Sequence, residues 1–248
     1  MIYQNQPEDW EDLQNKVCSI LTVCGLRSET EKDIDTVRGN VEIDVYATDP
    51  TTPENLIYVC ECKHWNTAVP KNVVHGFRTV TSDIGAHVGL IIAKSGFQSG
   101  AFDTAINSNV KLLTWYEFQE LFIDRWKESR YQELKSLFEE LFEYYDYLSA
   151  PIGNAISGNQ DRLDEYSNLI KRFSAQAAAN PWNRIIDKEK FPPELPFKTV
   201  EIDQSGLTIE VEFEDYSSLF NWFENQSNLG LSEFQNFVAK NRTGAVGE

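Results

Sequence analysis

The chain has 248 residues, of which 41% are hydrophobic and 12% aromatic, a composition typical of globular proteins with a sizeable core. Its formal net charge of −17 argues against a surface that binds polyanions throughout, so any binding of nucleic acid would depend on a local basic patch and metal ions. The first residues show no basic segment followed by an apolar one, and no apolar run approaches the roughly 18 residues of a membrane span. We therefore expect a cytoplasmic protein with no membrane partner.

The first half of the sequence mixes helical and extended patterns. Apolar residues at helical spacing predict a first helix, which Gly25 ends, and an extended segment then reaches a turn at Gly39 and Asn40. Later strands are separated by helices, which predicts parallel crossovers and an α/β domain with a mixed central sheet flanked by helices. The expected helices are 8–24, 71–84 and 99–109, and the expected strands are 41–48, 56–63, 88–94 and 110–115.

The second half is more acidic and mainly helical, with 24 acidic and 13 basic side chains over residues 116–248. We expect helices over 116–148 and 161–178, a loop over 180–197, a hairpin of strands 198–203 and 207–213, two short helices at about 215–226 and 232–240, and a frayed tail from 241. The expected organisation is a first domain over 1–116, a helical segment over 117–180 and a small α+β accessory region over 181–248.

The four cysteines lie in apolar surroundings and lack the paired spacing of a zinc site. They are Cys18, Cys24, Cys60 and Cys62. This pattern favours reduced thiols in the core.

The stretch "LIYVCECKHWN", residues 56–66, places a carboxylate and a lysine at the end of an apolar strand. Alternation puts Glu61 and Lys63 on one face, and Asp44 lies on a neighbouring predicted strand, where antiparallel pairing brings side chains within about 5 Å. Two ionised carboxylates that close repel each other, and a hard divalent cation such as Mg²⁺ between them removes the repulsion. With the ammonium of Lys63 to stabilise negative charge, this arrangement suits phosphodiester hydrolysis. The tripeptide "ECK" taken alone is more often a surface pattern.

These residues also carry a family resemblance. "RGNVEIDVYA" followed by "YVCECKHW" resembles the two-strand core of the PD-(D/E)xK nuclease superfamily, and residues from about 10 to 115 resemble Mrr-type restriction endonuclease domains. The resemblance extends to the opening helix "WEDLQNKVCSILTVCGL", to "VGLIIAKSGFQSGAFDTA" and to "VKLLTW". It implies a restriction-endonuclease-like core, followed here by a mainly helical α+β C-terminal region.

The resemblance implies a DNA endonuclease that depends on Mg²⁺, for which Mn²⁺ can substitute, and that acts in defence against foreign DNA. It implies Asp44 and Glu61 as metal ligands, Lys63 as the catalytic lysine and Glu11 as the early glutamate of the opening helix. The family often has glycine, any residue, glycine, isoleucine and aspartate here, whereas this chain places Val41 and Glu42 between Gly39 and Ile43. Glu42 either binds a second ion or faces water, and Glu11 either joins the metal site or complements the helix dipole.

Several further residues are candidates for contacts with DNA. Gln98 lies at a strand-to-helix turn where helix amides can meet a phosphate or a metal-bound water, although a plain helix start explains it equally well. The basic candidates for holding the phosphate backbone are Lys71, Arg78 and Lys94. His64 and His75 are more often structural.

Three functions stay open. The favoured one is an Mrr-like endonuclease, a homodimer where both strands are cut, whose C-terminal region contacts a protein partner, a second subunit or a DNA feature. The second is a structure-selective nuclease, since Holliday junction resolvases share the helix glutamate, the aspartate and the ExK pattern. The third is a non-enzymatic adaptor with a nuclease fold. RNA also stays open as the substrate, and the acidic second half is expected to contribute little phosphate affinity.

Overall fold

The computed structural model describes residues 1–178, 192–203 and 205–242. The chain divides into two compact units, Met1–Ser129 and Arg130–Glu248, and each is described here by itself. Most of the loop expected over 180–197 and the last six residues of the expected tail lie outside the described residues. No described helix has the length and apolar character needed to cross a membrane.

The first unit is built on a five-stranded sheet with the order β1-β2-β3-β4-β5. The strands β1, β2 and β3 pair in antiparallel fashion, whereas β3, β4 and β5 are parallel, so the mixed sheet expected from the sequence is confirmed. Their bounds are β1 Arg27–Thr36, β2 Gly39–Asp49, β3 Leu56–Lys63, β4 Val88–Ala93 and β5 Val110–Thr114. Along the edge strand β1 every second residue is exposed, and nearly all of these residues are acidic.

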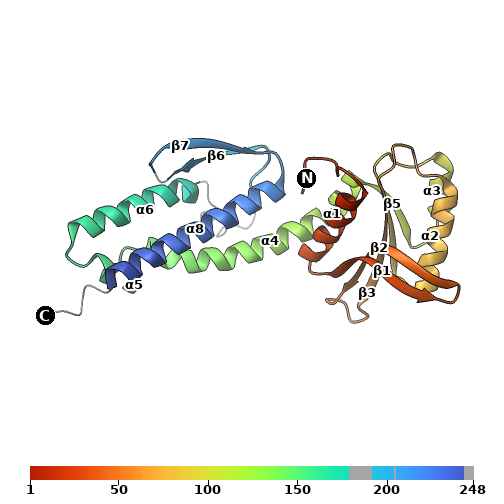
Figure 1. Ribbon diagram of the computed structural model, residues 1–248, viewed down its shortest axis with the longest axis horizontal. Coiled ribbons are helices and arrows are strands. Elements are labelled where there is room, and N and C mark those ends of the chain that lie inside the picture. Colours follow the sequence, from red (N-terminus) through yellow and green to blue (C-terminus); the bar gives the residue numbers. More distant parts are fainter. Residues whose placement is uncertain (179–191, 204, 243–248) are drawn as a thin grey trace. The chain divides into compact units, whose positions relative to one another are not determined.

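Helices cover both faces of this sheet, with α1 on one side and α2 and α3 on the other (Figure 1). Their bounds are α1 Trp10–Val23, α2 Lys71–Ile84 and α3 Ser99–Ala105. The helix α1 begins after Asp9, whose carboxylate accepts a hydrogen bond from the Asp12 amide at 2.8 Å. It buries Leu13, Val17 and Ile20, which the helical spacing of the sequence predicted.

The connection between β1 and β2 corrects one expectation. The turn expected at Gly39 and Asn40 is formed instead by Val37 and Arg38, and Gly39 is already paired with Thr36 as the first residue of β2. Gly39 has a φ of 119°, which a residue with a side chain adopts rarely. The hydroxyl of Thr36 donates to the Gly39 carbonyl at 2.7 Å and so closes the hairpin.

A long helix, α4 Trp115–Tyr145, starts directly after β5. Its first turns pack in the first unit, where Trp115 stacks with Tyr3 at 6.1 Å between ring centroids. Further along, Arg125 donates two hydrogen bonds to the buried Asp49 carboxylate, at 2.6 and 3.1 Å, and a third to the Cys24 carbonyl at 2.6 Å. One side chain therefore joins α4, the end of β2 and the end of α1.

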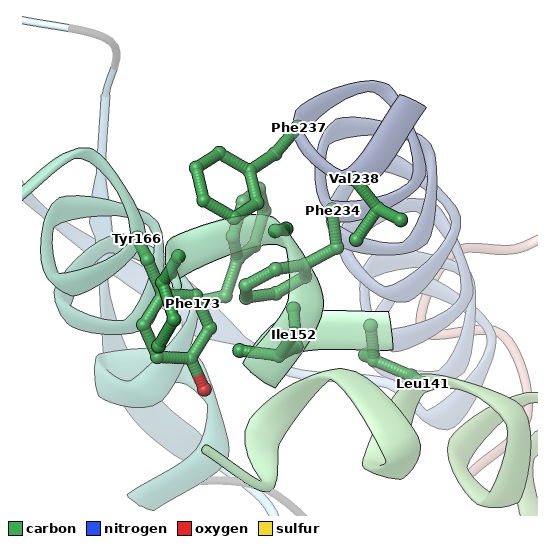
Figure 2. Close-up of a cluster of buried hydrophobic side chains, with 9 residues drawn as sticks. Leu141, Ile152, Tyr166, Phe173, Phe234, Phe237 and Val238 are labelled. Carbon is green, nitrogen blue, oxygen red and sulfur yellow. The ribbon is translucent and has the colours of Figure 1, made fainter. Parts of the chain in front are cut away.

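In its described residues, the second unit has helices around an aromatic core and a β-hairpin. Figure 2 shows Phe234 and Phe237 meeting Tyr166, Phe173 and residues of two other helices. The bounds are α5 Ala150–Ile156, α6 Gln160–Ala178, β6 Phe197–Ile202, β7 Thr208–Phe213 and α8 Tyr216–Arg242. The hairpin agrees with the sequence pattern, and its strands pair in antiparallel fashion.

The expectation of two short helices near the C-terminus is wrong, because α8 is continuous from Tyr216 to Arg242. Gly230 falls between the two expected helices, 215–226 and 232–240. In the structure, the Phe173 ring lies 3.1 Å from where a Cβ of Gly230 would stand, so this glycine gives the ring room inside an unbroken helix. Asn241 also belongs to α8, and its side chain donates to the Phe237 carbonyl at 2.8 Å, so the tail begins later than expected.

Candidate active site

Asp44 is held against β3 by its own carboxylate. The pairing of β2 with β3 ends at Val45 and Cys60, and one residue further the Oδ2 atom of Asp44 accepts a hydrogen bond from the Cys62 amide at 2.6 Å. The acceptor is thereby fixed between the two polar positions of β3, Glu61 and Lys63. Near its end, β3 is therefore contacted by the Asp44 carboxylate of the neighbouring strand β2.

On its other side Asp44 faces strand β1, whose backbone is distorted at Glu31. The pairs Thr30 with Val45 and Lys32 with Ile43 belong to the ladder, whereas Glu31, which lies across from Asp44, is unpaired and has a φ of 54°. A left-handed glutamate inside a strand costs of the order of 1–3 kcal/mol, and such conformations collect at functional sites. The ladder is therefore interrupted on the β1 side of Asp44.

Glu61 and Lys63 share one face of β3 and form an ion pair between Oε1 and Nζ. Their side chains are 23% and 17% exposed, so both are largely removed from water yet reachable. Burial raises the pKa of Glu61, the negative charge of Asp44 raises it further, and the ammonium of Lys63 opposes both effects. Asp44, Glu61 and Lys63 therefore act on one another electrostatically.

The alternate residues of β3 face the interior. Cys60 and Cys62 are buried, and burial raises the pKa of both thiols, so they carry no charge at neutral pH. Val59, which has the parity of Glu61, packs in a cluster with Val74 and Phe77 of α2. The face that carries Glu61 and Lys63 is thus the α2 face of the sheet.

The donor set suits a hard divalent cation. Two carboxylates, one of them made harder to ionise by its neighbour, gain from a cation between them, and Mg²⁺ is commonly held by one or two carboxylates with water in its other positions. Among the described residues no group of three or more His, Cys, Asp or Glu side chains could hold a metal ion. Asp44 and Glu61 are the two carboxylates of this site that would hold such an ion.

Glu11 lies at the exposed first turn of α1 and does not join Asp44 and Glu61 in such a group of three within the described residues. The start of α1 is nevertheless held beside the chain that follows β3, because His64 Nε2 donates to the Pro7 carbonyl at 3.0 Å. The metal-shell role of Glu11 stays a prediction. Glu42 is exposed in β2.

The candidates for DNA contacts have different surroundings. Arg78 donates to the Thr104 carbonyl at 2.7 Å, near the end of α3, and so has a role inside the fold. Lys94 Nζ donates to the Asn66 side chain at 3.1 Å, while Lys71 is exposed at the start of α2. Gln98 is exposed and forms no side-chain cap on α3, a helix of seven residues. His75 is exposed on α2.

Comparison with known proteins places the first unit in a family. Residues 6–122, just under half of the chain, match the family model Mrr_cat, described as a restriction endonuclease. Residues 6–122 are an Mrr-type restriction endonuclease domain. Asp44, Glu61 and Lys63 all lie inside the Mrr-type domain, as does the interrupted ladder next to Asp44.

Three solved structures resemble the chain at a distance. A protein of unknown function, AF1548, has 19% identity over 73% of this chain and 97% of its own, with a TM-score of 0.40. Can2 from Sulfobacillus thermosulfidooxidans, in complex with cyclic tetra-adenylate, has 16% identity over 47% of this chain and 36% of its own, with a TM-score of 0.37. AspBHI, a DNA modification-dependent restriction endonuclease, has 16% identity over 47% of this chain and 30% of its own, with a TM-score of 0.26. A search of curated proteins found no match.

Trp65, which lies beside the site, was not singled out from the sequence. Trp65 follows Lys63 by two residues and is 42% exposed, with the Lys63 Nζ atom 5.4 Å from its ring centroid. The alternation that placed Glu61 and Lys63 on one face would have placed Trp65 there as well, had the strand pattern been continued past its last residue.

Proposed function

We propose that the protein is a Mg²⁺-dependent endonuclease that hydrolyses phosphodiester bonds of DNA and acts in the cytoplasm against foreign DNA. The observation that carries this proposal is the convergence of Asp44, in the middle of β2, with Glu61 and Lys63, at the end of β3, within a restriction endonuclease domain.

Asp44 and Glu61 would hold the ion through their carboxylate oxygens. When bound, Mg²⁺ supplies Lewis-acid stabilisation of a phosphoryl oxygen and lowers the pKa of a coordinated water. The Cys62 amide keeps Asp44 in place through its hydrogen bond, and the burial of Glu61 limits competition from bulk water. Both carboxylates are therefore positioned by the fold before any ligand arrives.

Lys63 would stabilise the negative charge that develops on the phosphate. Its backbone is fixed by pairing with Ala93 and by a hydrogen bond from the Lys94 amide to its carbonyl at 3.0 Å. Its side chain is largely buried, and its ammonium pairs with Glu61 and lies 5.4 Å from the centroid of the Trp65 ring. A charge held in a dry and fixed position stabilises a transition state more than a mobile one, because little reorganisation is needed.

The test is cleavage of plasmid, linear and branched DNA with and without Mg²⁺, using Glu61→Ala and Lys63→Ala. Losing a group of this kind costs about a hundredfold or more in rate, so both variants should be inactive at ordinary enzyme concentrations. Matched controls are Asp33→Ala and Lys111→Ala, which remove an exposed carboxylate and an exposed lysine from other strands. Undiminished cleavage by either site variant would refute the assignment, and a strong preference for the branched substrate would favour a junction nuclease.

The homodimer and the protein partner of the C-terminal region stay predictions. The homodimer is expected for the case in which both strands of a duplex are cut, since this calls for two sites and therefore two copies of the chain. Sedimentation of the full chain with a duplex that it cannot cleave, in Ca²⁺, would measure this number directly.

A further inference from the structure

Tryptophan exposure in this protein is uneven. Of its six tryptophans, five lie in the described residues, and Trp115, Trp126 and Trp222 are at most 8% exposed. Trp10 and Trp65 are 54% and 42% exposed. Single exposed aromatic side chains are common on protein surfaces, so exposure alone does not mark a site. Trp65 differs from Trp10 in lying beside Lys63 of the candidate active site.

The indole of Trp65 lies beside Lys63, just beyond the end of β3. Glu61, Lys63 and Trp65 follow one another at every second position, and the Lys63 Nζ atom is 5.4 Å from the centroid of the Trp65 ring. A cation at this distance is attracted by the ring and orients it. The ring is thus directed beside the ammonium that would meet the scissile phosphate.

The backbone that carries Trp65 is held on both sides. The Ser95 hydroxyl donates to the Trp65 carbonyl at 2.6 Å, and Lys94 Nζ donates to the next side chain, Asn66, at 3.1 Å. On the other side, His64 is bonded to the Pro7 carbonyl. An exposed ring on a fixed backbone loses little entropy when a ligand binds, which is the property of a stacking platform.

The charges of the first unit disfavour a duplex held by many phosphate contacts. Residues 1–129 carry 19 acidic and 11 basic side chains. Most of the basic side chains are already engaged, in ion pairs of Lys16, Lys32, Arg38, Lys63 and Arg125 and in hydrogen bonds of Arg78 and Lys94. Affinity for duplex DNA grows with the number of phosphates neutralised, whereas a base stacked on an aromatic ring contributes affinity without any cation.

We propose that Trp65 stacks on an unpaired nucleobase next to the scissile phosphate, so that the substrate of this domain is single-stranded or locally unpaired DNA. This inference rests on the proposed nuclease function and adds the class of substrate. A paired base is covered on both faces by its neighbours and cannot reach the ring, whereas an unpaired base offers one free face.

DNA binding measured in Ca²⁺ tests the stacking role of Trp65 independently of catalysis. The full chain is titrated in Ca²⁺ against a fluorescein-labelled single-stranded oligonucleotide and against the same sequence as a duplex, and anisotropy is measured. We expect tighter binding of the single strand, a loss of about tenfold or more for Trp65→Ala on the single strand only, and retention of most affinity in Trp65→Phe. The control Tyr147→Ala removes an aromatic ring that is 52% exposed in the second unit, and it should change neither affinity. Equal losses on the two ligands, or no loss on the single strand, would overturn the proposal.

Cleavage in Mg²⁺ then distinguishes the stacking role of Trp65 from the nuclease function. A wild-type protein that cleaves duplex DNA as fast as single strands, with Glu61 and Lys63 required and Trp65 dispensable, would refute the stacking role and leave the nuclease function intact. A protein that cleaves no DNA but binds single strands through Trp65 would refute the nuclease function and support the stacking role. Faster cleavage of single strands that is lost in Trp65→Ala supports both.

Discussion

Asp49→Asn should destabilise the first unit through a single interaction. Asp49 is 3% exposed at the end of β2, and its carboxylate accepts two hydrogen bonds from Arg125 and two from Thr51. Because Arg125 also donates to the Cys24 carbonyl, the pair connects α4 to β2 and α1. An asparagine of the same shape keeps an acceptor for Thr51 and loses the charge that Arg125 faces.

The size of the effect follows from the geometry. Each hydrogen bond to a charged group contributes about 1.5–3 kcal/mol to stability, and two such bonds to Arg125 are weakened. The Arg125 side chain is 37% exposed, so water replaces part of what is lost. We therefore expect the free energy of unfolding to fall by about 2 kcal/mol, less than the roughly 3–5 kcal/mol for removing one partner of a fully buried pair.

The effect depends on pH in a defined direction. The hydrogen bonds from Arg125, with those from Thr51, hold the pKa of the Asp49 carboxyl well below its usual range, although burial opposes them. A group whose pKa is lower in the folded state contributes stability above its unfolded pKa, near 4, and loses this contribution as pH falls through the folded value. The stability difference between wild type and Asp49→Asn should therefore be constant at neutral pH and shrink below about pH 4.

The assay is urea unfolding of the full chain between pH 3 and 7, with amide hydrogen exchange of α1 to assign the change to the first unit. The matched control is Glu29→Gln, which breaks the exposed pair with Lys32 and should cost less than about 0.5 kcal/mol. A loss for Asp49→Asn no larger than for Glu29→Gln would refute the reasoning, as would a difference that grows on acidification.

Three other substitutions test other parts of the molecule. Mg²⁺ or Mn²⁺ should raise the melting temperature of the wild type, corresponding to about 2.7 kcal/mol at a hundred times the dissociation constant, and Glu61→Gln should lose most of this shift; an unchanged shift would mean that the ion binds elsewhere. Gly89→Ala should destabilise the sheet by about 1–3 kcal/mol in urea unfolding, because its Cβ would lie 2.9 Å from both Thr81 Oγ1 and Val110 Cγ2, and wild-type stability would contradict that packing. Phe234→Ala should lower the free energy of unfolding by about 3–5 kcal/mol, since this fully buried ring contacts four other aromatic rings. The control Leu229→Ala, on the exposed side of α8, should lower it far less, and equal losses would contradict the position of the core.

The sequence predicted the parts of the site that depend on local periodicity. Alternation along β3 placed Glu61 and Lys63 opposite the buried Cys60 and Cys62, as the structure has them. The approach of Asp44 was predictable because an antiparallel neighbour with the right register needs only a short connection. The hydrogen bond from the Cys62 amide to Asp44 was not predictable, because it arises where the ladder stops.

Features that depend on distant residues escaped the sequence argument. Gly230 reads locally as a helix break, and only the ring of Phe173, more than fifty residues earlier, explains its place within α8. From the sequence Arg78 was a candidate for contacts with DNA, whereas in the structure its guanidinium donates a hydrogen bond to the Thr104 carbonyl. The first unit extends to Ser129 because α4 packs on residues such as Tyr3 and Cys24, contacts that no local pattern near the end of β5 reveals.

The edge strand β1 has a consequence for the behaviour of the protein at high concentration. No strand among the described residues pairs with its outer side, and the amides and carbonyls along such an edge can template another chain. The exposed positions of β1 include Glu29, Glu31, Asp33 and Asp35. A second copy of the same strand would bring carboxylates against carboxylates at spacings that repel. The strand thereby opposes growth into fibrils, and neutralising these four positions should turn a stable solution into one that aggregates.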